Sequence, residues 1–299
     1  MAAQTTLRQQ QLPAGRRQLG KKARAAIAKG VAYLLLTLGG LLMALPFFWL
    51  VSSSLKPIQL IYVVPPIWIP DPPRWKNYVD IFTLLPFGLY MRNTMIIVIS
   101  ATIGQVLTGA MSAYAFARLR WPGRDIWFGL LLATMMLPGA VTMIPRFIIF
   151  KWLGWLDTFA PLIVPFWMGG SAFSVFLLRQ FFLTIPMELE DAARIDGASS
   201  ALIFARIMLP LAVPAMSVVA IFSFLGHWND FMGPLIYLNT SEKRTLALGI
   251  NSLQGLEWGR DNTELLMAAG VVMVLPTILI FIVAQDVFVQ GIVMTGIKG

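Results

Sequence analysis

Long stretches without a charged residue alternate with short polar segments along the chain. Six of these stretches, at 31–55, 93–117, 126–145, 158–178, 207–229 and 265–285, contain no Asp, Glu, Lys or Arg. Each reaches the length of about 20 residues that a helix needs to cross a hydrocarbon core of about 30 Å. Within lipid the backbone must pair its own N–H and C=O groups, which favours helices. The pattern therefore predicts an all-α, polytopic integral membrane protein with six transmembrane helices.

The composition agrees with a chain that lies in a bilayer. Hydrophobic residues make up 58% of it and charged residues 12%, whereas soluble domains carry about 25% charged residues. Cysteine is absent and His227 is the one histidine, so disulfides, thiolate metal sites, His-based zinc sites and Ser–His triads have almost no residues to draw on. We expect no catalytic residue, no metal ion and no cofactor in this chain.

The charges near the N-terminus predict the orientation. Residues 1–30 contain seven basic residues and no acidic one, and Lys and Arg beside a first span hold their segment in the cytoplasm. The run 31–55 exceeds the about 7–15 apolar residues of a signal peptide, so we interpret it as an uncleaved anchor. Binding of the basic arm to nucleic acid is the weaker alternative. The expected organisation is a basic cytoplasmic arm (1–30), a six-span domain (31–290) and a cytoplasmic tail (291–299).

The outer loop predicted at 56–92 is rich in proline and aromatic residues. Six prolines lie within 57–73, which argues against a regular helix, and the tryptophans and tyrosines suit the headgroup layer. An interfacial collar explains this composition better than a ligand site does.

The segment 186–210, PMELEDAARIDGASSALIFARIMLP, carries the densest group of charges in the predicted inner loops. Acidic residues at its start complement the positive end of a helix dipole. Gly197 can take a positive φ and end that helix, and Ser199 or Ser200 can cap a second one. We predict a short helix, a glycine bend and another helix on the cytoplasmic face. The spacing alone does not decide between a docking site for a partner and an ordinary amphipathic connection.

The same segment resembles the EAA motif of binding-protein-dependent ABC import permeases: Glu-Ala-Ala, three residues, Gly, nine residues, Ile, one residue, Leu-Pro. Asp191 stands where the motif has Glu, so the charge is kept and one methylene is lost. The segments WNDFMGPL at 228–235 and TLALGINSLQG at 245–255 are similar to the maltose and glycerol-3-phosphate type of carbohydrate permease, in particular to the shorter of its two permease subunits. The resemblance implies an ATPase-coupling loop that contains Glu190, Asp191, Ala192, Ala193, Asp196, Gly197, Ile207, Leu209 and Pro210.

The resemblance also implies a set of partners in a bacterial or archaeal cytoplasmic membrane. These are a second permease in a heterodimer, two cytoplasmic ATPase subunits that bind ATP and Mg, and an extracytoplasmic solute-binding protein. The chain contains no GxxxxGK[ST] loop, which agrees with ATP binding on another subunit. A secondary transporter or channel without an ATPase partner is the main alternative, and a membrane-embedded enzyme is another. The first usually needs a buried ionisable residue and the second a catalytic cluster, and the six stretches supply neither.

Polar and helix-breaking residues inside the predicted spans are the candidates for a solute pathway. Gln105, Thr108 and Ser112 share one helical face, which either lines a pathway or lets helices approach closely; the second interpretation is favoured. Prolines and the pair Gly169-Gly170 predict broken helices of the kind that transporters place around central sites. Trp228, Asn229 and Asp230, at the outer end of the fifth span, can stack on a sugar ring and bind hydroxyls, although an interfacial Trp beside a polar helix end explains them as well.

Overall fold

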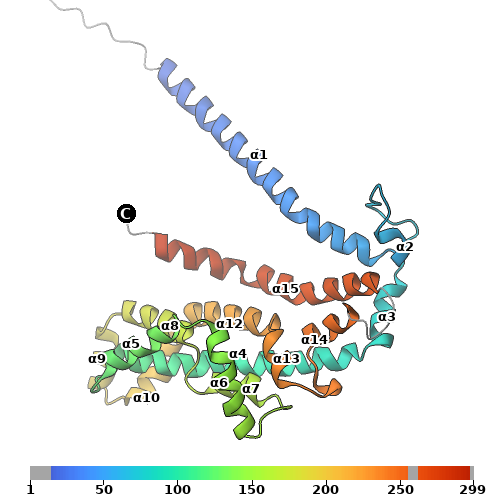
Figure 1. The fold of residues 1–299 in the computed structure, drawn as a ribbon. Coiled ribbons are helices and arrows are strands. Elements are labelled where there is room, and N and C mark those ends of the chain that lie inside the picture. Colours follow the sequence, from blue (N-terminus) through green and yellow to red (C-terminus); the bar gives the residue numbers. More distant parts are fainter. Residues whose placement is uncertain (1–14, 255–261, 297–299) are drawn as a thin grey trace, which may run out of the picture.

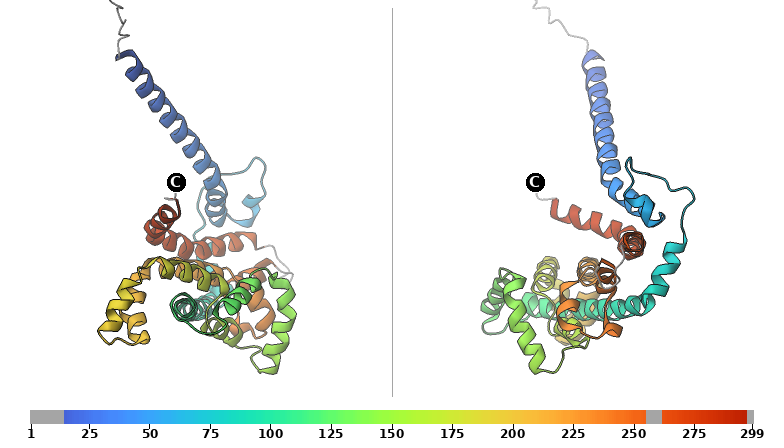
Figure 2. Two further views of the ribbon diagram at one scale, coloured as in Figure 1. Left: turned by 90° about the vertical axis from the view of Figure 1, so that its left-hand side faces the viewer. Right: turned by 45° about the vertical axis from the view of Figure 1, so that its right-hand side comes forward.

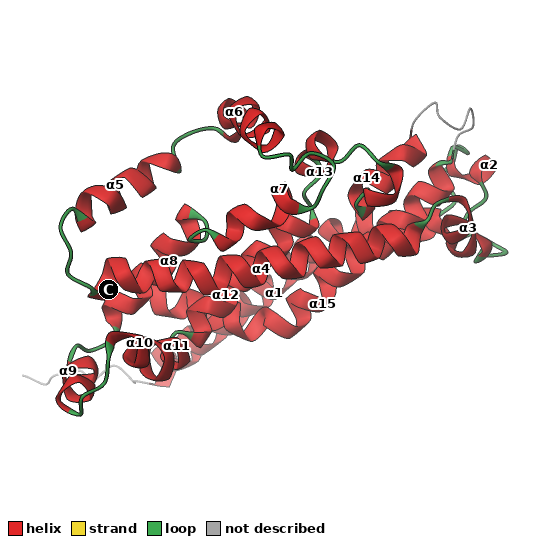
Figure 3. Ribbon diagram, turned by 90° about the horizontal axis from the view of Figure 1, so that it is seen from below, coloured by secondary structure: helices red, strands yellow, loops and turns green. Residues whose placement is uncertain are grey.

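The structure is a computed structural model that describes residues 15–254 and 262–296, and within these ranges it contains helices and no strand (Figures 1 and 3). The helices are α1 (Gly15–Ser54), α2 (Ile58–Ile61), α3 (Lys76–Leu84), α4 (Phe87–Arg118), α5 (Arg124–Thr134), α6 (Gly139–Trp152), α7 (Ala160–Ile163), η1 (Val164–Trp167), α8 (Ala172–Thr184), α9 (Glu188–Ile195), α10 (Ser200–Ile203), η2 (Phe204–Met208), α11 (Leu209–Leu211), α12 (Val213–Trp228), α13 (Met232–Tyr237), η3 (Ser241–Lys243), α14 (Leu246–Asn251), η4 (Ser252–Gln254) and α15 (Thr263–Gly296).

The described part of the chain contains four to six segments that can span a membrane. Four are long and apolar enough alone: Ala23–Ser54, Phe87–Arg118, Ala160–Thr184 and Thr263–Gln285. Two bent pairs qualify when each is counted as one span: α5 with α6, and Ser200–Leu211 with α12. The prediction of an all-α, polytopic membrane protein is confirmed, and the six predicted spans correspond to these four segments and two pairs.

The predicted span at 126–145 is not one continuous helix. α5 ends at Thr134, α6 begins at Gly139, and the two helices meet at 104°. Pro138 lies in the break with φ −58° and ψ 135°. Proline has no N–H to donate, and it disfavours the α conformation of the residue before it. Hydropathy reports how readily a segment enters lipid and not whether its helix is continuous, so the expectation of a single helix here is wrong.

The fourth and fifth predicted spans are broken where prolines and glycines occur. Gly169 and Gly170 have φ values of 107° and 76° and separate η1 from α8. Ser200–Leu211 meets α12 at 76°, directly after the π-helical turn η2 and Pro210. Prolines and π-turns are the usual causes of sharp bends, and the prolines and glycines of these two spans predicted their breaks. Pro276 in the sixth span was expected to break its helix too, but it lies inside the continuous helix α15.

The proline-rich loop 56–92 contains more helix than expected. α2 forms one turn after Pro57, and α3 has nine residues. α3 begins at Lys76, beyond the last clustered proline, so its backbone donors are intact. The expectation that proline prevents a regular helix holds for residues 63–73 and not for the rest of this loop.

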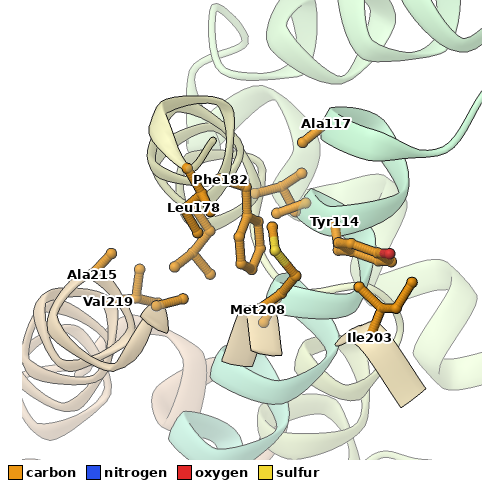
Figure 4. Packing of buried hydrophobic residues seen from close by; sticks show 13 residues of the cluster. Tyr114, Ala117, Leu178, Phe182, Ile203, Met208, Ala215 and Val219 are labelled. Carbon is orange, nitrogen blue, oxygen red and sulfur yellow. The ribbon is translucent and has the colours of Figure 1, made fainter. Parts of the chain in front are cut away.

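The long helix α4 is the centre of the helical body. It packs along α8 and α12, and a Cβ added to Gly170 would lie 2.7 Å from the Cα of Gly109 on α4, so the two backbones nearly touch. One hydrophobic cluster joins α4, α8, α12 and the segment 203–212 around Tyr114, Phe182 and Met208 (Figure 4). Phe182 and Met208 have no exposed surface.

A second cluster lies at the other end of α4. It joins α3, α4, α12, α14 and α15 around Phe87, Trp228, Leu246 and Ala268. α1 contributes no residue to either cluster. Its C-terminal end packs on α15, and the rest of the helix projects away from the body in each view of Figure 2. None of the most hydrophobic part of Ala23–Ser54 is buried within the chain, so this helix presents its surface to lipid or to another protein.

The N-terminal end of α1, the C-terminal end of α15 and the segment α9–α10 lie on the same side of the molecule (Figures 1 and 3). α2, α3 and α14 lie at the opposite end. This arrangement agrees with an even number of spans. Residues 1–14 of the predicted arm and 297–299 of the predicted tail lie outside the described residues; 15–30 and 291–296 are helical continuations of α1 and α15.

Candidate functional site

The segment 188–203 forms the helix, bend and helix that its sequence predicts. α9 carries Glu188, Glu190 and Asp191 in its first turn. Gly197 follows with φ +81°, and the Ser199 hydroxyl caps α10 by accepting the N–H of Leu202 (3.3 Å). A Cβ at Gly197 would meet nothing within 4 Å. Glycine is therefore favoured there by its backbone conformation and not by a lack of space.

Glu190 fixes α9 to the membrane domain. Its side chain has no exposed surface, and its Oε1 lies 3.2 Å from Nε of Arg118, the last residue of α4. Arg194, one turn along α9, approaches Oε2 at 3.6 Å from the exposed side. A buried carboxylate is tolerated only when a charge partner is present, so this ion pair holds one particular face of α9 against the end of α4.

Arg118 also binds the end of α8. Its guanidinium donates to the carbonyl oxygens of Phe182 (2.5 Å) and Ile185, and it contacts the sulfur of Met187. The last carbonyls of a helix have no partner within that helix, and a cation suits them because of the helix dipole. Arg118 thus joins α4, α8 and α9. Sequence reasoning missed this role; the only available signal was an Arg directly at the end of a hydrophobic run.

The opposite face of α9 is exposed. Asp191, Ala192, Asp196 and Gly197 are exposed, and Ile195 retains 86% of its surface. The other motif residues point inward or lie along the body: Ala193, Ile207 and Leu209 pack against the hydrophobic cluster of Figure 4, and Pro210 is exposed at the bend. The buried anchors of the loop are Ile203 and Met208, which the resemblance did not single out.

The predicted pathway face of α4 makes close helix contacts. Gln105 donates to the hydroxyls of Ser171 (3.1 Å) and Ser174 (2.7 Å), and Thr108 donates to the carbonyls of Gly104 (2.7 Å) and Phe166 (3.1 Å). Ser112 lies beside Gly169. These contacts agree with the interpretation that small and polar residues hold the broken fourth span on α4. Contact of any of them with solute stays a prediction.

Trp228, Asn229 and Asp230 face three different surroundings. Trp228 is 1% exposed, stacks on Phe224 and donates Nε1–H to the carbonyl of Met273 (3.0 Å). It therefore lies in the core and does not present its ring to a solute in this conformation. Asn229 is exposed and donates to the carbonyl of Leu225 (2.8 Å). Asp230 lines a cavity and accepts the N–H of Gly233 (3.0 Å).

The cavity beside Asp230 has a volume of about 470 Å³. It lies between α4, α6, α7–η1, the end of α12 and α13, in the half of the molecule distant from α9. Burial raises the pKa of the Asp230 carboxyl above the usual aspartate range, while backbone N–H groups at Gly233 and Met232 act in the opposite direction. The walls of the cavity are mostly apolar and are formed by Thr94, Ile97, Val98, Gly139, Ala140, Met143, Arg146, Phe150, Pro161, Leu162, Pro165, Phe166, His227, Asp230, Met232, Gly233, Pro234, Ile236, Tyr237 and Thr245.

Comparison with known families identifies the chain. Residues 105–294, which include both α9 and the cavity-lining end of α12, match the family of the binding-protein-dependent transport system inner membrane component. The chain belongs to this family. The suspected resemblance to ABC import permeases is confirmed.

Relatives of this permease cover nearly its full length. It is 34% identical over 270 residues to the diacetylchitobiose uptake system permease protein NgcG of Streptomyces coelicolor, with 89% of each chain covered. It is 32% identical over 268 residues to the sn-glycerol-3-phosphate transport system permease protein UgpE of Yersinia enterocolitica, covering 87% of this chain and 94% of the relative. The inner membrane ABC transporter permease protein YcjP of Escherichia coli is 32% identical over 259 residues, covering 85% and 91%.

The fold of the permease is also found in solved structures. A chain of a bacterial ABC transporter involved in the import of the acidic polysaccharide alginate superimposes with a TM-score of 0.77 at 21% identity, covering 93% of this chain and 99% of that one. A chain of the bacterial alginate transporter in complex with an alginate pentasaccharide-bound periplasmic protein gives 0.57 at 15% identity, covering 88% and 95%. At these identities the likeness concerns the fold.

Proposed function

We propose that this permease is one of two different membrane subunits of an ATP-driven importer. The importer passes a sugar or sugar-like solute from a solute-binding protein into the cytoplasm. The relatives support the solute class, because their names refer to diacetylchitobiose and sn-glycerol 3-phosphate, and the matching structures belong to an alginate importer. The permease corresponds to the shorter subunit of the pair and lies in the cytoplasmic membrane of a bacterium or archaeon, with both termini and α9 inside.

The exposed face of α9 is the observation that carries the proposed coupling to an ATPase. Ile195 is 86% exposed on a helix whose other face is fixed by a buried ion pair. Burying such a side chain is worth about 1.5–3 kcal/mol, so a partner that covers it gains free energy. Two cytoplasmic ATPase subunits bind ATP and Mg, and closure of their dimer moves α9. The Arg118–Glu190 pair passes this motion to α4 and α8.

Coexpression tests this proposal. The permease, a second permease and an ATPase from the same source should purify as one complex, and vesicles containing it should take up sugar when ATP and the binding protein are supplied. A hydrolysis-deficient ATPase variant is the control and should abolish uptake without loss of assembly. Recovery of a homodimer of this chain that transports sugar without any ATPase would refute the proposal.

A further inference from the structure

The cavity between α6, α7 and the end of α12 contains polar atoms that lack partners. Nε2 of His227 and Oγ1 of Thr245 are buried, and neither has a hydrogen-bond partner in the described part of the chain. Thr245 is only 4% exposed. Buried polar groups nearly always have a partner, so two unpaired groups in the wall of one cavity indicate that something polar occupies it.

Aromatic rings line the same cavity. Phe166 meets the His227 ring edge-on with centroids 4.3 Å apart, and Phe150 meets Tyr237 in the same way at 5.2 Å. All four residues border the cavity. Its volume of about 470 Å³ falls in the range of roughly 300–1,000 Å³ that is typical of small-molecule sites, which combine apolar walls with a few convergent polar groups.

The charges around the cavity favour an uncharged ligand. Among the described residues of its wall, Asp230 is the one acidic residue and Arg146 is the one Lys or Arg. Arg146 is exposed, and its guanidinium is already bound to the hydroxyl (2.6 Å) and carbonyl (3.4 Å) of Thr142. Bonds to the neutral Thr142 leave the charge of Arg146 intact, so this guanidinium and the Asp230 carboxylate together give the wall no net charge. An anionic ligand therefore gains no net attraction, and it must approach the Asp230 carboxylate, a like charge that repels it.

The geometry points to a binding site for one unit of an uncharged saccharide in this subunit. A sugar hydroxyl can both donate and accept hydrogen bonds, and so can the side chains of neutral His227 and Thr245. The Asp230 carboxylate can accept a hydrogen bond from a sugar hydroxyl. The carbon–hydrogen faces of a sugar ring suit the rings of Phe166 and Tyr237. This inference rests on the proposed function and makes it more specific: the permease itself contacts solute, and it selects against acidic sugars.

The absence of cysteine from the chain allows a direct test. Ala140 borders the cavity and is exposed. Ala140→Cys should react with a maleimide in the complex of both permeases and the ATPase. Maltose or N,N′-diacetylchitobiose at about ten times its Kd should slow this reaction by about tenfold, because only about one tenth of the sites are then empty. Gly88→Cys is the matched control, since an added Cβ there meets nothing within 4 Å; its labelling should not respond to sugar.

The charge selectivity is tested by a second variant. A diuronate from alginate should not protect Ala140→Cys, but it should do so when Asp230→Asn is added, because the amide oxygen can still accept the Gly233 N–H. Equal protection by the diuronate with and without Asp230→Asn would overturn the selectivity. Absence of protection by the neutral sugars while ATP-driven sugar uptake continues would overturn the site and leave the proposed function intact. Protection in a complex that never couples ATP hydrolysis to uptake would instead refute the proposed function.

Discussion

Replacement of Arg118 by Gln should release α9 from the membrane domain while every span stays in place. Arg118 and Glu190 are 3% and 0% exposed, with Nε and Oε1 3.2 Å apart. In the variant the charge partner left to the buried carboxylate is Arg194, at 3.6 Å and 47% exposed. The carbonyls of Phe182 and Ile185 also lose the guanidinium as a donor. Removing one partner of a buried ion pair costs about 3–5 kcal/mol.

This cost should appear as local opening of α9, because a short helix at the periphery of the fold can detach without unfolding the rest. Since 1.36 kcal/mol corresponds to a factor of about ten, 3 kcal/mol would accelerate amide exchange in α9 by roughly a hundredfold. Glu190→Gln should have a smaller effect, because Arg118 still donates to Phe182 and Ile185. The double variant should cost less than the sum of the two single variants, as expected for side chains in direct contact.

Hydrogen exchange detected by mass spectrometry on the two-permease membrane complex, before the ATPase is added, measures this opening. Arg206→Gln is the matched control, since Arg206 is exposed in the same loop. Exchange of α9 in Arg118→Gln within a factor of two of the parent protein would refute the conclusion that the ion pair fixes this helix.

Three further variants test other parts of the structure. Gly197→Val should misorient α9 at a cost of about 1–2 kcal/mol, because valine resists a φ of +81°, although its side chain would meet no clash. ATPase binding in pull-down assays should therefore fall. Gly197→Asn should bind the ATPase normally, because asparagine tolerates this backbone conformation. Trp228→Ala should lower the Tm of the complex, since losing a buried Trp costs about 3–5 kcal/mol, whereas Asn229→Ala should leave the Tm unchanged. Hydrogen bonds from Thr240, followed by one from Lys243, hold the pKa of Asp157 well below its usual range. The ionised Asp157 carboxylate therefore stabilises the folded protein at pH values above the ordinary aspartate pKa of about 3.9. This stabilisation is lost only as the pH falls through the lower pKa of the folded state. The Tm deficit of Asp157→Asn, measured by thermal unfolding at a series of pH values, should therefore be constant from neutral pH to about pH 5 and shrink in stronger acid.

The sequence predicted the features that depend on local chemistry. Charge-free length predicted the spans, because lipid excludes unpaired charges. Acidic residues, a glycine and a serine at the right spacing predicted α9, the bend at Gly197 and the cap at Ser199. Each of these depends on neighbouring residues only, so a single sequence contains the necessary information.

Features that depend on contacts between distant residues could not be predicted in this way. The partner of Glu190 is Arg118 at the end of α4, and α5, α6, α7, η1 and α8 lie between the two residues in the chain. No local pattern connects them. Trp228 was a candidate for solute contact because it precedes Asn229 and Asp230. α12 ends at Trp228, and the chain leaves the helix at Asn229 and Asp230. These neighbours therefore face the core, the exterior and a cavity. The 104° break between α5 and α6 was missed because hydropathy is insensitive to bends.

If the exposed face of α9 couples the ATPase to the permease, a charge placed on that face should disturb the coupling. The measurement is sugar-stimulated ATP hydrolysis by the reconstituted complex that carries Ile195→Asp. Ile195 is 86% exposed, so the substitution should leave the fold intact and place a charge in the docking contact, where an unpaired buried charge is costly. Asp125→Asn, at an exposed position in the first turn of α5, is the control and should hydrolyse ATP at the parental rate. Ile195→Asp should lose both ATPase binding and sugar-stimulated hydrolysis while the two permeases still assemble. Parental binding and hydrolysis in Ile195→Asp would contradict coupling of the ATPase through this face.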